Sequence, residues 1–311
     1  MSKSIFSAPQ FNDEAAAYAF VEAHLWADGR ACPHCGVLDQ SGPLRGKSNR
    51  IGLYKCYACR KPFTVKVGTI FEASHIQMRD WLSAIHLICS SKKGISANQL
   101  HRTLGITLKS AWFMAHRIRE AFKPAGQQAP MGGEGGFVEA DEMYIGHKKD
   151  TVAKAGGGAH KHAVMALVER GGRMRSLYMP TMRKVDAQDV VKHHVSPKAH
   201  LHTDQSQLYF GIENWVASHA TVNHSEEEYV RGDVTTNTVE GAFGLFKRGM
   251  VGTYQHCGVQ HLQRYLNEFD FRYSNRTKLG VGDEARTVKA LKGAVGKRLT
   301  YRTTSGQEAR A

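Results

Sequence analysis

The sequence has no long hydrophobic run and comparatively little negative charge. No stretch approaches the roughly 18 continuous apolar residues that indicate a membrane span, and the N-terminus lacks the apolar core of a signal peptide. Against 42 Lys and Arg stand 28 Asp and Glu, so the formal net charge is +14. This balance favours a polyanionic partner, with nucleic acid first, and gives no reason to expect a membrane partner.

Cysteine is scarce as well. The 311 residues include six, and four of them form two tight pairs. That arrangement is typical of a metal site and not of the disulfide framework of a secreted protein. Reduced cysteines and the missing signal peptide together predict a cytoplasmic protein.

The two cysteine pairs have the spacing of zinc knuckles. Cys32-Pro-His-Cys35 and Cys56-Tyr-Ala-Cys59 are separated by 20 residues, and short strand-like pieces lie around them. Four thiolates arranged tetrahedrally form a structural zinc site, which leaves no open position for a substrate. We therefore predict a zinc ribbon over residues 31–67, held together by Zn²⁺ bound to Cys32, Cys35, Cys56 and Cys59.

The segments on either side of the ribbon are predicted to be helical. Residues 1–30 contain one expected helix over 12–26, with Asn12 or Asp13 as its cap. Apolar residues at helical spacing predict three more helices within the segment 68–125. These helices are expected over residues 78–90, 96–104 and 108–122.

The last two of these helices have the lengths and the central glycine of a helix-turn-helix. Gly105 opens the turn and Thr107 is the expected N-cap of the second helix. Lys109 and Arg117 on that helix would then contact DNA in a groove, together with Ser110, His116 and Arg119. An ordinary helical hairpin with a solvated basic face remains the alternative.

After a glycine-rich linker over residues 126–136, the sequence predicts an α/β domain over 137–275. Its strands are expected at 137–145, 162–169, 174–179 and 199–203, with Gly171-Gly172 as a hairpin turn. Its helices are expected at 186–195, 206–218, 238–250 and 259–270, with a loop over 221–236. Residues 276–311 are predicted to be a basic tail, and from Ala242 onward there are 13 Lys and Arg against 5 Asp and Glu.

Three acidic residues of this domain lie in settings that would aim them at one point. Asp141 lies in a strand-like run, Asp204 ends another, and Glu240 opens a predicted helix. Hard divalent cations require clustered oxygen ligands, and two such cations can clamp the attacking and leaving oxygens of a phosphodiester. Lys247 follows Glu240 by two helical turns on the same face, where it could meet a DNA phosphate.

Each of these assignments has a rival. Strand alternation places Glu139 on the same face as Asp141, so Glu139 could be the ligand instead, and Glu142 is a weaker candidate. Asn237 lies three residues before Glu240 and is an alternative third residue. His202 shares a strand face with Asp204 and could support it, although a core or solvated histidine is the simpler interpretation.

With these residues the sequence resembles the DDE transposases of bacterial insertion sequences, in particular the branch with an N-terminal zinc ribbon and an integrase-like catalytic domain. The resemblance covers about residues 15–280. It is carried by Val-Glu-Ala-Asp-Glu-Met-Tyr-Ile-Gly around Asp141, by His-Thr-Asp-Gln-Ser around Asp204, and by Asn-Thr-Val-Glu-Gly-Ala-Phe-Gly-Leu-Phe-Lys-Arg-Gly around Glu240. The ribbon alone is common to many proteins, whereas the combined order and spacing is specific.

The resemblance implies an α/β fold with a ribonuclease-H-like mixed sheet flanked by helices, preceded by the small zinc ribbon and the helix-turn-helix-like segment. It implies that the ends of a mobile element are cut and joined with two Mg²⁺ ions, for which Mn²⁺ may substitute. We expect Asp141 to bridge the two ions, with Asp204 and Glu240 each completing one coordination shell.

The same resemblance implies partners and a location. Lys109, Arg117, Lys247 and Arg248 would contact double-stranded DNA, comprising the terminal inverted repeats and the target. A homo-oligomer would assemble on paired ends, nucleoid-associated in the cytoplasm. Two other functions remain open: a structure-specific nuclease on the same fold, which would cut without joining, and a non-catalytic zinc-ribbon DNA-binding regulator.

Overall fold

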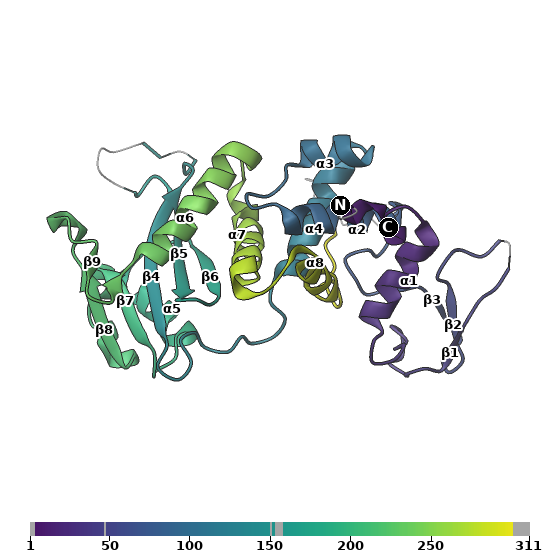
Figure 1. Ribbon diagram of the computed structural model, residues 1–311, viewed down its shortest axis with the longest axis horizontal. Helices are drawn as coiled ribbons and strands as arrows, with labels where there is room; N and C mark the ends of the chain where they lie inside the picture. The colour runs from purple at the N-terminus through teal and green to yellow at the C-terminus, as the bar shows by residue number, and fades with distance from the viewer. Residues whose placement is uncertain (1–3, 47, 150, 153–157, 301–311) are drawn as a thin grey trace. The chain divides into compact units, whose positions relative to one another are not determined.

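The chain folds into two compact units, described separately below. The computed structural model describes residues 4–46, 48–149, 151–152 and 158–300 (Figure 1). The first unit comprises residues 1–124 together with 282–311, and the second comprises residues 125–281. Within the described residues, no helix combines the length and the hydropathy that a membrane span requires.

The ribbon of the first unit is a small sheet beside one helix. Helix α1 (Glu14–Leu25) follows the short turns η1 (Ile5–Ser7) and η2 (Pro9–Phe11), and the side chain of Asp13 caps it by accepting from Ala16 N. The strands β1 (Ser41–Pro43), β2 (Tyr54–Cys56) and β3 (Pro62–Phe63) pair antiparallel in the order β1-β2-β3. Tyr54 links the sheet to α1, because its hydroxyl donates to Glu22 Oε2 at 2.7 Å.

Three helices of the first unit lie where the sequence predicts them. They are α2 (Met78–Ser90), α3 (Ala97–Leu104) and α4 (Leu108–Phe122). Ser96 and Gln99 form a capping box at the start of α3, and Gly105 ends that helix at φ 66°. Thr107 caps α4 by accepting from Ser110 N, so its predicted role is confirmed.

The region predicted as a basic tail contains a further helix, α8 (Asp283–Lys292), after the turn η7 (Thr277–Leu279). Helix α8 packs on α2: Arg286 Nη1 donates to Cys89 O at 2.6 Å, and Thr287 Oγ1 lies 3.1 Å from His86 Nδ1. The helix has few apolar residues that a sequence pattern could detect: its buried aliphatic side chains are those of Ala290 and Leu291. Its stabilising contacts are polar and long-range, which a local hydrophobic pattern does not reveal.

The second unit is built on a five-stranded mixed sheet. Its strands are β4 (Phe137–Ile145), β5 (His162–Glu169), β6 (Met174–Met179), β7 (His200–Asp204) and β8 (Ser218–Val222). The order is β6-β5-β4-β7-β8; β4 and β6 run antiparallel to β5, whereas β7 is parallel to both β4 and β8. The first three strands coincide with the predicted ranges.

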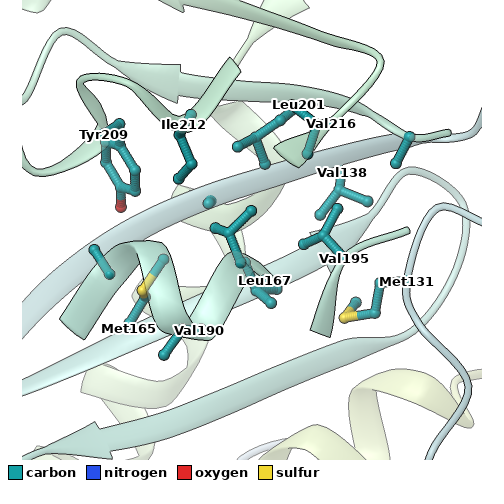
Figure 2. Close-up of a cluster of buried hydrophobic side chains, with 14 residues drawn as sticks. Met131, Val138, Met165, Leu167, Val190, Val195, Leu201, Tyr209, Ile212 and Val216 are labelled. Atoms are coloured by element: carbon teal, nitrogen blue, oxygen red, sulfur yellow. The ribbon is translucent and has the colours of Figure 1, made fainter. Parts of the chain in front are cut away.

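Helices cover both faces of this sheet. Helix α5 (Lys184–His194) packs on one face, over a core that includes Val138, Leu167 and Tyr209 (Figure 2). Helices α6 (Asn237–Gly249) and α7 (Val259–Ser274) pack on the other, with Met143 and Phe246 in the core between them and the sheet. Helix α6 continues into a π-helical turn, η6 (Met250–Tyr254). The predicted ribonuclease-H-like mixed sheet flanked by helices is confirmed.

The prediction is wrong between residues 206 and 236. In place of a helix over 206–218 there are two 3₁₀ turns, η3 (Gln207–Tyr209) and η4 (Ile212–Trp215), separated by Gly211 at φ 84°. That left-handed backbone interrupts any continuous helix. The expected loop over 221–236 contains the end of β8, the turn η5 (His224–Glu226) and the small hairpin β9 (Val230–Arg231) and β10 (Val234–Thr235).

Candidate active site

Three acidic side chains predicted from the sequence lie on neighbouring elements of the second unit. Asp141 lies on β4, Asp204 is the last residue of β7, and Glu240 lies in the first turn of α6. The strands β4 and β7 are parallel neighbours whose register pairs Glu139 with His202. Two residues further along each strand, Asp141 and Asp204 therefore lie level with each other and on the same face.

Asp141 and Asp204 both lie within reach of other negative charges. Burial raises the pKa of Asp141 to about 8, and the charges of Glu142, Asp204 and Glu240 add to that rise. Burial also raises the pKa of Asp204, and Glu240 contributes, although Ser206 N and His224 oppose the shift. The raised pKa values of Asp141 and Asp204 mean that negative charge at these two positions is poorly compensated, and a bound cation would offset it.

Each carboxylate keeps one oxygen available. One oxygen of each accepts a local hydrogen bond: Asp141 Oδ1 from Glu142 N at 2.7 Å, Asp204 Oδ1 from Ser206 N at 3.1 Å, and Glu240 Oε1 from Thr236 Oγ1 at 2.7 Å. In the described part of the chain, no hydrogen bond reaches the second oxygen of any of them. Carboxylate oxygens are the ligands that Mg²⁺ and Mn²⁺ prefer, so the donor set fits such ions.

The three carboxylates are nevertheless spread out. Among the described residues, the cysteines of the ribbon are the one group of three or more possible metal ligands whose ligand atoms all lie within 4.8 Å of one another. Oxygens bound to a single Mg²⁺ lie within about 4 Å of each other. One ion would therefore not contact all three carboxylates in this arrangement.

Glu139, the rival of Asp141, has a different environment. Its side chain is 0% exposed, and its two oxygens accept four hydrogen bonds. Arg170 Nε and Thr238 Oγ1 donate to Oε1 at 2.9 and 2.8 Å, whereas Thr238 N and Val239 N donate to Oε2 at 2.7 and 3.1 Å. A carboxylate so fully engaged has little capacity left for an ion, which favours Asp141 as the ligand.

Glu142, the other acid beside Asp141, is tied to a buried tyrosine. Its Oε2 accepts from the Tyr209 hydroxyl at 2.8 Å, and burial raises the pKa of Glu142. Tyr209 is 1% exposed and belongs to the core under α5 (Figure 2). This contact assigns Tyr209 to packing, and sequence reasoning did not identify its pairing with Glu142.

On α6, Asn237 and Glu240 lie one turn apart. Asn237 is exposed, and its backbone N donates to Thr235 Oγ1 at 3.1 Å. Glu240 is joined by a histidine that the sequence did not single out, since His224 Nε2 lies 3.2 Å from Glu240 Oε1. No local motif pointed to His224, because it lies in the segment predicted as a loop.

The two basic residues of α6 remain at the surface. Lys247 and Arg248 are both exposed in the last turn of the helix. Lys247 follows Glu240 by seven residues, which corresponds to about 10 Å along the helix axis. Its position leaves it accessible to a long polyanion that passes Glu240.

The four ribbon cysteines meet in the first unit. Cys32 Sγ lies 3.7 Å from Cys59 Sγ, and Cys35 Sγ lies 3.7 Å from Cys56 Sγ. Sulfurs bound tetrahedrally to zinc at about 2.3 Å are separated by about 3.8 Å, so the spacing fits zinc. None of the four is in a disulfide.

The predicted DNA contacts of α4 require a correction. Lys109 is exposed, as a groove contact requires. Arg117 is only 5% exposed, because its guanidinium donates to Glu72 O and lies over the rings of Trp81 and Phe113. His116 and Arg119 are also buried, at 1% and 2% exposed. Arg117 therefore stabilises the helical unit and does not lie at a surface where DNA could bind.

A four-cysteine ribbon is followed in this chain by a mixed sheet with acidic residues on adjacent strands. Two family models match this chain: a transposase zinc-ribbon domain over residues 12–62, and an ISXO2-like transposase domain over residues 134–274. The chain therefore carries a transposase zinc-ribbon domain and an ISXO2-like transposase domain. The second match runs from just before β4 to the end of α7 and so includes all three acids.

The chain is also similar to a protein of a transposable element and, more distantly, to two solved structures. The chain is 26% identical over 267 residues to an uncharacterized protein in transposable element ISH50 of Halobacterium salinarum, covering 79% of this chain and 86% of the relative. A pre-cleavage Mos1 transpososome matches at 10% identity over 68% of this chain and 74% of that chain, with a TM-score of 0.27. The mariner Mos1 paired end complex with Mg matches at 13% identity over 66% and 75%, with a TM-score of 0.24.

Proposed function

We propose that this transposase cuts and joins the ends of an insertion sequence by metal-dependent phosphodiester hydrolysis and transesterification, with Asp141, Asp204 and Glu240 as the catalytic acids. The observation that carries the proposal is the environment of Asp141. It is a partly buried carboxylate on β4, next to Asp204 and Glu240, and its pKa is raised to about 8 by burial and by its acidic neighbours. The two transposase-domain matches support the reaction class, and the position of this site supports the choice of residues.

In this proposal Asp141, Asp204 and Glu240 would hold two Mg²⁺ ions, for which Mn²⁺ could substitute. Such ions supply Lewis acidity at the attacking and leaving oxygens of a phosphodiester. Lys247 and Arg248 bind phosphates of the strand that approaches along α6. Water would be the attacking group in cutting and a terminal 3′-hydroxyl in joining, so no serine, cysteine or tyrosine nucleophile is required.

The remaining elements bind and organise DNA. Cys32, Cys35, Cys56 and Cys59 hold a structural Zn²⁺, and Lys109 contributes a DNA contact from α4. The partners are double-stranded DNA, as terminal inverted repeats and as target, and further copies of the chain assembled on paired ends. This activity places the protein at the nucleoid, in the cytoplasm.

The test is Asp204→Ala in the full-length chain. We expect this variant to lose Mg²⁺-dependent cleavage of a duplex carrying the inverted repeat that flanks the gene, by on the order of 10³-fold or more. Binding of the same duplex, measured by gel shift, should change little. Asp189→Ala is the matched control, since Asp189 is an exposed acid on α5; full cleavage by Asp204→Ala would sink the assignment.

A further inference from the structure

One ion pair contacts all three elements that carry the acids, namely β4, β7 and α6. Glu139 and Arg170 form it, with Arg170 Nε 2.9 Å from Glu139 Oε1. The carboxylate is 0% exposed, and the arginine side chain is 26% exposed. Glu139 lies two residues before Asp141 on β4, so the two side chains point to the same face of the sheet.

One arm of the pair holds the start of α6. The N-cap residue Thr236 provides no side-chain cap to the helix. Glu139 takes that role from β4, accepting from Thr238 N and Val239 N. A carboxylate is well suited to this position because it satisfies unpaired N–H groups and meets the positive end of the helix dipole. Glu240 follows these two residues directly, so its place relative to β4 depends on this cap.

The other arm reaches β7 and the approach to α6. Arg170 Nη2 lies 3.0 Å from His202 Nδ1 and donates to Thr235 O at 3.3 Å. His202 lies two residues before Asp204 on β7. The pair thus contacts each acid-bearing element one or two residues before its acid: at Glu139 itself on β4, at His202 on β7, and at Thr238 and Val239 on α6.

We propose that Glu139 and Arg170 are positioning residues that fix the spacing of Asp141, Asp204 and Glu240 for cation binding. This inference rests on the function proposed above. From the alternation of the strand, Glu139 was only an alternative metal ligand to Asp141. Here it is assigned a positioning role instead. Neither residue needs to touch an ion or DNA for this role.

Glu139→Gln is the sharpest perturbation of the pair. Glutamine keeps the shape of the side chain but presents one acceptor oxygen and one NH₂ group. Wherever that NH₂ group points, it faces donors, either Thr238 N and Val239 N or Arg170 Nε. The variant therefore loosens α6 or releases Arg170 without removing any acid of the site.

The chain offers a matched control in Glu268→Gln. Glu268 is likewise 0% exposed and paired with an arginine, Arg272, four residues along α7. Helix α7 carries none of the three acids. Both substitutions remove a buried carboxylate charge from an ion pair with arginine in the same unit, so a general loss of stability should affect both variants similarly.

The experiment measures Mn²⁺ binding to the zinc-loaded full-length protein, using the electron paramagnetic resonance signal of free Mn²⁺. Thermal melting is recorded in parallel, and Asp204→Ala serves as the binding-deficient reference. We expect Glu139→Gln to bind Mn²⁺ about 10- to 100-fold more weakly than the wild type, the range typical when a group that orients a metal ligand is lost. The Mn²⁺ affinity of Glu268→Gln should stay within about twofold of the wild type, even if its melting temperature falls as much as that of Glu139→Gln.

Arg170→Lys keeps the positive charge but loses the forked contacts to His202 and Thr235, so it should also weaken Mn²⁺ binding; it decides the matter if Glu139→Gln does not fold. If Glu139→Gln and Arg170→Lys, or the one of them that folds, bind Mn²⁺ as tightly as the wild type, the positioning role is wrong and the proposed function stands. The same holds if Glu268→Gln weakens Mn²⁺ binding as much as they do. A wild type that binds no more Mn²⁺ than Asp204→Ala would instead overturn the proposed function, and the positioning role with it.

Discussion

Glu139 and Asp141 lie two residues apart on one face of β4, and yet their surroundings give them different properties. Glu139 accepts four hydrogen bonds, three from α6 and one from Arg170. Asp141 accepts one, from the backbone N of its own neighbour. The alternation of a strand predicts that both face the same way but cannot separate them, because the donors to Glu139 come from residues 31 to 100 positions away.

A second enclosed acid gives a prediction about pH. Asp270 on α7 accepts from Ser176 N and Ser176 Oγ, both at 2.6 Å, and burial raises its pKa from 3.8 to about 6. A raised carboxyl pKa means that the folded state holds the proton more tightly than the unfolded chain. The associated stability is present below pH 4 and is lost as the pH rises through about 6.

Asp270→Asn should therefore stabilise the protein at neutral pH, by on the order of 1–2 kcal/mol. Asparagine removes the buried charge while its oxygen still accepts from Ser176 N. The check is thermal melting of both proteins between pH 4 and pH 8, with the difference expected to grow across that range. A variant that melts below the wild type at pH 8 would show that the ionised carboxylate stabilises the fold.

At the scale of elements, the sequence predicted what local patterns encode. The strands β4, β5 and β6 coincide with their predicted ranges, because continuous apolar runs and the turn at Gly171 mark them. Strand β8 was missed, since its pairing is parallel to β7 and arises from distant residues. The same limit applies to α8, whose packing depends on polar contacts to α2.

Helix α4 gives the prediction at this scale, because its two basic candidates differ in burial. Arg117→Ala should lower the free energy of unfolding by about 1–3 kcal/mol, since it leaves Glu72 O without its donor and opens space beside Trp81. Lys109→Ala should change the free energy of unfolding by no more than about 0.5 kcal/mol. Its effect should instead appear as weaker DNA binding, with a salt dependence reduced by about one counterion.

Chemical denaturation and fluorescence anisotropy at several salt concentrations distinguish the two effects. A fully stable Arg117→Ala protein with weakened DNA binding would show that Arg117 reaches DNA after all. In that case α4 would have to rearrange when DNA binds, since the side chain is buried in the structure described here.

At the scale of the whole molecule, the chain leaves its first unit at residue 124 and returns to it at residue 282. The transposase-domain match at residues 134–274 lies inside the second unit, and the zinc-ribbon match at 12–62 lies inside the first. The order of ribbon, helices and mixed sheet was predictable from cysteine spacing, helical periodicity and three acids. The sequence did not predict that the chain rejoins the first unit at residue 282, because residues 276–311 have the composition of a basic tail.

The central claim is that Asp141, Asp204 and Glu240 form the catalytic site, and the choice between Glu240 and Asn237 tests it most directly. The measurement is the Mg²⁺-dependent cleavage rate of a duplex carrying the flanking inverted repeat, for Glu240→Gln and for Asn237→Ala. We predict a loss on the order of 10³-fold for Glu240→Gln. We predict less than about a tenfold loss for Asn237→Ala, because the hydrogen bond of Asn237 to Thr235 uses its backbone N. Wild-type cleavage by Glu240→Gln together with loss of cleavage by Asn237→Ala would contradict the account.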